Sequence, residues 1–86
     1  MMPPSEARYA LLVRLAWELR AIPASTLLVF PYHAEPVLYV PCRDGHHEPI
    51  LAVCLSGRWR LVWRGTELAA ERLHDAARRI AMEAAA

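Results

Sequence analysis

Residues 49–64, PILAVCLSGRWRLVWR, decide the fold of this chain. The stretch contains two runs rich in Val, Leu, Ile and Trp, separated by Ser56-Gly57. Residues with strong β preference on both sides of a compact turn dipeptide are typical of a β-hairpin. We therefore expect strands at residues 50–55 and 58–64, joined by a tight turn.

Two further strands are expected before this hairpin. Residues 26–30 (TLLVF) and 37–41 (VLYVP) are short runs with strong β preference, and the prolines lie at or beyond their ends. Asp44-Gly45 is a strong two-residue turn signal between the second strand and the third. The central part of the chain thus predicts a four-stranded antiparallel meander.

Apolar residues recur at helical spacing near both ends of the chain. Pro3, Pro4 and Ser5 are expected to open the first helix, with Ser5 as its cap. Pro23 is expected to end it, because the residue before a proline is pushed out of the α region. Trp17 widens its apolar stripe and is expected to pack in the core; the alternative is a partner contact on the outer face of the helix. Gly65-Thr66 is expected to end the sheet and cap the second helix. The apolar stripes are Leu12, Leu15, Leu19 and Ile22 in the first helix, and Leu73, Ala76, Ala77, Ile80 and Ala84 in the second.

Length and element order together predict one α+β domain over residues 1–86, in the order α-β-β-β-β-α. The chain has 86 residues, a hydrophobic fraction of 56% and a net charge of +1. The apolar fraction is high for so short a chain, and the balanced charge favours neither nucleic acid nor an acidic partner. The chain has no Lys, Asn or Gln, a pattern typical of the codon bias of a GC-rich bacterial genome.

A cytoplasmic location is expected. The longest apolar runs fall far short of the ~20 residues that a membrane span requires. The N-terminal segment lacks the pattern of a secretory signal, since Arg14, Glu18 and Arg20 interrupt its apolar residues. Cys42 and Cys54 are too few for a disulfide scaffold, so we expect both to be thiols.

If both turn dipeptides form tight turns, the register of strands two to four follows, because successive residues alternate between faces. Both faces are then apolar, whereas an antiparallel sheet with one wet face should alternate apolar with polar residues. One face would carry Val37, Tyr39, Ile50, Ala52, Cys54, Trp59, Leu61 and Trp63. The other would carry Leu38, Val40, Leu51, Val53, Leu55 and Val62, together with Arg58 and Arg60.

Two helices that pack together cover only one side of such a sheet. Both helices follow sheet edges through short connections, so we expect them side by side, leaving the second face open. An open apolar face of this size predicts a homodimer or docking to another protein. The expected contact surface is Leu38, Val40, Leu51, Val53, Leu55, Val62, Arg58 and Arg60. The alternative is one helix on each face and a monomeric protein.

A metal site at the second turn is one alternative function. In the tight-turn register Cys42 and His47 lie opposite each other, with His46 adjacent. A thiolate beside an imidazole binds zinc or, as a further alternative, forms an activated nucleophile. The spacing is not a standard zinc signature, Cys54 falls elsewhere, and His33 would have to come from a neighbouring loop. The more economical interpretation is a polar turn with a cysteine at a strand end, so no metal or cofactor is assigned.

Nucleic-acid binding by the fourth strand is a second alternative. Arg58, Arg60 and Arg64 alternate with Trp59 and Trp63, and aromatic residues beside arginines stack bases on an open sheet. The two residue types point to opposite faces, however, and no RNA-recognition motif is present. The simpler interpretation places the tryptophans in the core.

The sequence also lacks the usual catalytic patterns. The acidic residues lie mostly in helical segments, and the three glycines are isolated turn residues that make no phosphate-binding loop. We therefore expect a small non-catalytic interaction module with no cofactor, working as a dimer or with another protein.

Overall fold

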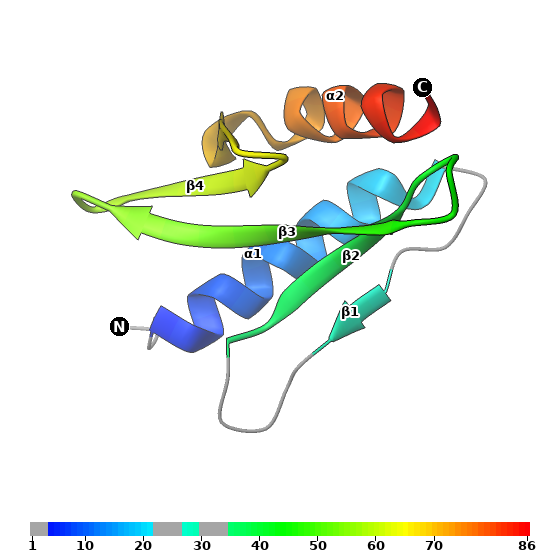
Figure 1. Cartoon of the computed structure of the whole chain (residues 1–86). Helices are drawn as coiled ribbons and strands as arrows, with labels where there is room; N and C mark the ends of the chain where they lie inside the picture. Colours follow the sequence, from blue (N-terminus) through cyan, green and yellow to red (C-terminus); the bar gives the residue numbers. More distant parts are fainter. Residues whose placement is uncertain (1–3, 22–26, 30–34) are drawn as a thin grey trace.

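The computed structural model describes residues 4–21, 27–29 and 35–86, and the side chains of residues 6–20 and 35–86. The predicted helix end at Ile22 and Pro23, the ends of the first predicted strand, and His33 lie outside the described residues. Figure 1 shows the arrangement of the elements. In chain order they are α1 (Pro4–Glu18), η1 (Leu19–Ala21), β1 (Leu27–Val29), β2 (Val37–Pro41), β3 (His47–Leu55), β4 (Arg58–Trp63), β5 (Thr66–Ala69), η2 (Ala70–Arg72) and α2 (Leu73–Ala85).

The strands form one antiparallel sheet in the order β1-β2-β3-β4-β5, an open meander between two terminal helices. This confirms the predicted α+β class and the order of its four expected strands. No helix in the described part of the chain has the length and apolar character needed to cross a bilayer.

Both helices pack on the same face of the sheet, as expected. Apolar residues of α1 and α2 share one buried cluster with one face of the strands. In Figure 1 the sheet lies in front of α1, so the face toward the reader is the one without helices. The buried cluster is Leu11, Leu12, Leu15, Leu19, Leu38, Val40, Cys42, Ile50, Ala52, Leu61, Trp63, Leu68, Leu73, Ala76, Ala77, Ile80 and Ala84.

The turn at Ser56-Gly57 forms as predicted. Leu55 pairs with Arg58, and the two turn residues have positive φ angles of 52° and 77°. Positive φ at both central positions matches the right-handed twist of a hairpin, which is why a glycine is favoured there. The register of β3 against β4 is therefore the expected one.

The turn at Asp44-Gly45 is longer than predicted. The backbone N–H of Cys42 donates to the carbonyl of His46 over 2.7 Å, and that of Gly45 donates to the carbonyl of Cys42 over 3.0 Å. The connection therefore spans residues 42–46, and Leu38 pairs with Ile50. A shift of one residue in the register moves every side chain of a strand to the other face of the sheet. In β2, Leu38 and Val40 therefore face the helices, where Val37 and Tyr39 were predicted to lie with Ile50.

A fifth strand replaces the predicted start of the second helix. Trp63 pairs with Thr66 across the two-residue turn Arg64-Gly65, where φ is 50° and 77°. Thr66 is therefore the first residue of β5 and not a helix cap, and α2 begins only at Leu73. The expectation was wrong because arginine in the left-handed region is uncommon, so residue type gave no turn signal.

Trp17 does not pack in the core. Its side chain is 65% exposed on the outer surface of α1. The guanidinium carbon of Arg20 lies 4.2 Å from the centre of its ring, a cation–π contact that depends on this exposure.

Candidate functional site

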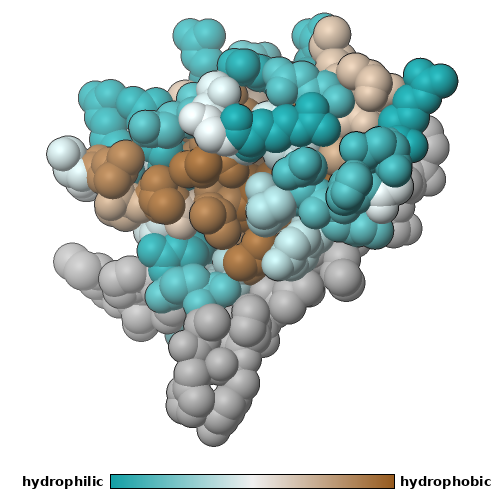
Figure 2. Space-filling model, in the orientation of Figure 1, coloured by the Kyte–Doolittle hydropathy of each residue, from teal (hydrophilic) through white to brown (hydrophobic). Residues whose placement is uncertain are grey.

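The open face of the sheet is the candidate functional surface. Cross-strand pairing places apolar residues from β2, β3 and β4 on it, with two arginines and one glutamate. Leu51 is 43% exposed and Leu55 is 49% exposed, although both lie in strands. Figure 2 shows this face as a continuous apolar patch bordered by hydrophilic residues. Its members are Val37, Tyr39, Pro49, Leu51, Val53, Leu55, Val62, Arg58, Arg60 and Glu67.

Six of the eight residues predicted for the contact surface occupy this face: Leu51, Val53, Leu55, Val62, Arg58 and Arg60. The placement of Leu38 and Val40 was wrong. Both are 0% exposed and belong to the core, because the longer connection after β2 turns them toward the helices.

Val37 and Tyr39 take the places of Leu38 and Val40 on the open face. The signal that sequence reasoning missed is Asp44, whose Oδ1 accepts a hydrogen bond from the backbone N–H of His46 over 2.9 Å. An Asp that bonds the backbone two residues ahead stabilises a turn by itself, and here the connection is wider than a two-residue hairpin loop. This hydrogen bond and the side chain of His46 hold the pKa of Asp44 below its ordinary value.

One cross-strand row dominates the open face. Leu51 pairs with Val62, and Val62 pairs with Glu67. In the next row toward the hairpin turn, Val53 pairs with Arg60. The apolar residues of these rows therefore lie next to Arg60 within β4 and to Glu67 on β5. Neither Arg60 nor Glu67 forms an ion pair within the described part of the chain.

The structure does not bring Cys42 and His47 together across the sheet. His47 pairs with Pro41, and Cys42 lies inside the connection. Cys42 is buried, and its Sγ lies 3.7 Å from the Val40 carbonyl and accepts from Arg64 Nη2 at 3.4 Å. No group of three or more His, Cys, Asp or Glu side chains suited to a metal ion occurs among the described residues.

The tryptophans of β4 lie on the covered face. Trp63 is 0% exposed, and its Nε1 donates to Glu83 Oε1 over 3.0 Å. Trp59 is half-buried on the same face, while Tyr39 lies on the other. The three rings therefore do not form a shared stacking platform.

The open face offers apolar contacts and a few charged groups. Among the residues whose side chains are described, no polar or charged one is buried. The open face presents apolar side chains and fixed charges at its ends. An arrangement of this kind holds another surface by burial of apolar area and by charge pairing.

Comparison with known proteins gives no match to a protein-family model, to a curated protein or to a solved structure.

Proposed function

We propose that this protein is a non-catalytic interaction module that forms a homodimer through the open face of its sheet. The observation that carries the proposal is the exposure of Leu51 and Leu55 in a sheet whose two helices pack on the other face. Apolar side chains on a regular, rigid surface gain about 25 cal/mol per Å² when a partner removes them from water. The module works in a reducing compartment such as the cytoplasm, where Cys42 and Cys54 remain thiols.

The dimensions of the face suit a dimer. The nine residues of β3 span roughly 30 Å, and five strands side by side span roughly 20–25 Å. A stable interface buries about 800 Å² on each partner, which is of the same order as this face. A homodimer presents the same patch from both copies, so each apolar row meets another apolar row.

Charge complementarity supports a second copy as the occupant. On the open face, Arg58 and Arg60 lie toward the hairpin end of β4, and Glu67 lies opposite Val62, farther from that end. A two-fold axis that crosses the strands reverses the strand direction of the second copy. Each Glu67 then approaches the arginines of the other copy, and complementary charges fix the register of the contact.

Sedimentation equilibrium over about 1–200 µM protein tests the proposal, because dimerisation is a mass-action effect. We expect wild-type protein to be dimeric and Leu51→Glu to remain folded by circular dichroism but to be monomeric. The substitution would weaken the dimer by about a hundredfold or more, since it buries an unpaired charge in the contact. Met82→Glu is the matched control: Met82 is 70% exposed on α2, and its substitution leaves the dimer intact.

Charge reversal tests the proposed geometry separately. Arg60→Glu and Glu67→Arg each place like charges together and weaken the dimer. The double variant restores the pairing and recovers most of the affinity. Monomeric wild-type protein over the whole range overturns the dimer, and failure of the double variant to recover affinity overturns the proposed orientation.

A further inference from the structure

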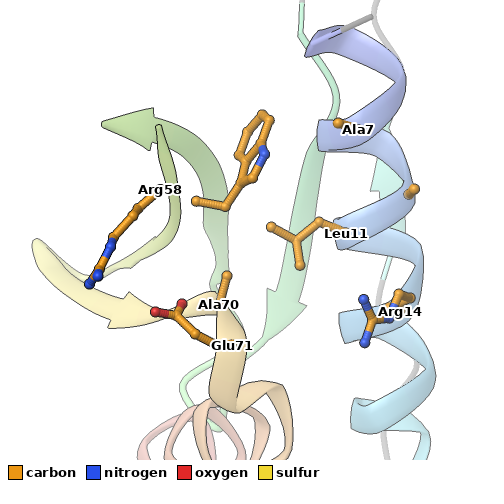
Figure 3. Close-up of a pocket in the computed structure, with 8 residues that line it drawn as sticks. Ala7, Leu11, Arg14, Arg58, Ala70 and Glu71 are labelled. Atoms are coloured by element: carbon orange, nitrogen blue, oxygen red, sulfur yellow. The ribbon is translucent and has the colours of Figure 1, made fainter. Parts of the chain in front are cut away.

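A groove of about 590 Å³ lies between α1 and the opposite wall formed by β4 and η2, away from the sheet face described above. Figure 3 shows Ala7, Leu11 and Arg14 on α1 at one side of the groove and Ala70 at the other, where the charged ends of Arg58 and Glu71 point away from α1. Ala10 and Trp59 complete the lining. The volume is within the roughly 300–1,000 Å³ of ordinary ligand sites.

Small side chains leave the groove open. Three of its eight lining residues are alanines, Ala7 and Ala10 on α1 and Ala70 on η2. The methyl side chain of an alanine is too short to fill the gap between α1 and η2. The result is an apolar floor of alanine and Leu11 at the edge of the core, a position that larger residues would have filled.

Trp59 forms a wall whose position is set by Arg8. The Arg8 guanidinium carbon lies 5.4 Å from the centre of the Trp59 ring, and Arg8 Nε donates to the carbonyl of Ala52 over 2.7 Å. Arg8 also forms an ion pair with Glu35. These contacts hold the ring in place in the free protein, so less side-chain entropy is lost when a ligand binds.

The polar groups of the groove are Arg14, Arg58 and Glu71, which sum to a charge of +1 at neutral pH. None of the three forms an ion pair within the described part of the chain. An arginine without a carboxylate partner is suited to binding a carboxylate by two parallel hydrogen bonds. One monovalent anion would neutralise the groove.

We propose that this groove binds an amphipathic monocarboxylate, with the apolar body on the alanine floor beside Trp59 and the carboxylate on Arg14. Arg58 adds positive charge only at longer range, since its guanidinium points away from α1 (Figure 3). Glu71 opposes binding of a second negative charge, and it therefore favours a monoanion over a dianion. The groove shares only Arg58 with the proposed dimer contact, because none of its other lining residues is part of the open face.

Isothermal titration calorimetry of the full chain, with decanoate and 4-phenylbutyrate below micelle-forming concentrations, tests the proposal. The two probes separate an aliphatic body from an aromatic one. We expect at least one of them to bind with one site per chain, and decanol to bind at least about tenfold more weakly than decanoate, a difference of about 1.4 kcal/mol. Absence of binding by both carboxylates, or equal binding of decanol and decanoate, overturns the proposal.

Charge variants test the assignment of Arg14. Arg14→Gln keeps a good helix former on an exposed helix position, so the fold is retained, and affinity for the carboxylate falls about tenfold. Arg43→Gln, a change of another exposed arginine in the connection after β2, leaves affinity unchanged. Glu71→Gln removes a like charge and raises affinity about two- to fivefold. Equal effects of Arg14→Gln and Arg43→Gln would show that only net charge matters, and would overturn the site.

Location is tested by filling the groove. Ala10→Trp places a large ring over the alanine floor and abolishes binding, while Leu51→Glu on the open sheet face leaves it intact. Changes in the ¹H–¹⁵N spectrum on addition of decanoate should concentrate at Ala7, Ala10, Arg14 and Glu71. Binding that survives Ala10→Trp and disappears with Leu51→Glu assigns the carboxylate to the sheet face and overturns the groove.

Discussion

The two faces of the sheet are built from the same kinds of residue and have opposite surroundings. Along β3, Ile50 and Ala52 lie beneath the helices, while Leu51 and Val53 lie on the open side. Full burial of a Leu or Ile side chain contributes about 1.5–3 kcal/mol, which the covered face gains on folding. The apolar side chains of the open face remain partly exposed, so their burial against another molecule can still contribute part of that free energy. Apolar character alone therefore does not identify a core; the path of the helices does.

The largest expected effect is a difference in the free energy of unfolding between substitutions of two neighbouring residues on β4, one on each face. Trp63→Ala should destabilise the fold by about 3–5 kcal/mol, because it leaves a cavity under α2 and removes the hydrogen bond to Glu83. Val62→Ala, one residue away on the open face, should cost less than about 1.5 kcal/mol. Urea unfolding followed by circular dichroism measures both. Similar losses for the two variants would mean that both faces contribute equally to the folded chain.

A second pair of variants on β2 tests the corrected register. Leu38 is 0% exposed and Val37 is half-buried on the other face. Leu38→Ala should cost about 2–5 kcal/mol and Val37→Ala below about 1.5 kcal/mol, by the same unfolding measurement. A larger loss of stability for Val37→Ala than for Leu38→Ala would contradict the observed register. It would instead support a two-residue turn at Asp44-Gly45, with Leu38 on the open face.

The outcome at each turn shows how far sequence reasoning reached. Ser56-Gly57 was predictable because a glycine at the second central position and apolar runs on both sides favour one hairpin. Asp44-Gly45 was not, since Asp44 bonds the backbone of His46 and the connection widens to five residues. Arg64-Gly65 carries no signal in its first residue, so β5 was missed.

The open face was likewise easier to predict from the sequence than the groove. Leu51, Val53 and Leu55 lie in one strand, so alternation in the sequence predicts their shared face. Ala7, Ala10 and Ala70 are separated along the chain, and only the packing of α1 against η2 places them on one floor. Trp17 was assigned to the core because an aromatic residue at helical spacing is usually buried, whereas α1 has more apolar surface than one sheet contact covers.

The smallest expected effect is a pH dependence at the edge of the covered face. Glu83 accepts hydrogen bonds from Arg79 Nε over 2.8 Å and from Trp63 Nε1 over 3.0 Å, and these hold its pKa below the ordinary value. The folded state thus favours the carboxylate, so its contribution to stability is complete above about pH 4.3, the ordinary value for glutamate, and is lost as pH falls through the lowered pKa.

Thermal unfolding between neutral and acidic pH measures this contribution. On acidification, the melting temperature of the wild-type protein should fall further than that of Glu83→Gln, because the glutamine amide does not take up a proton in this pH range. Glu71→Gln is the control, because Glu71 has no hydrogen-bond partner among the described residues, and its curve should parallel the wild-type one. Parallel curves for all three proteins would mean that the contact between α2 and Trp63 is held by apolar packing alone, and that the edge of the covered face needs no charge to close it.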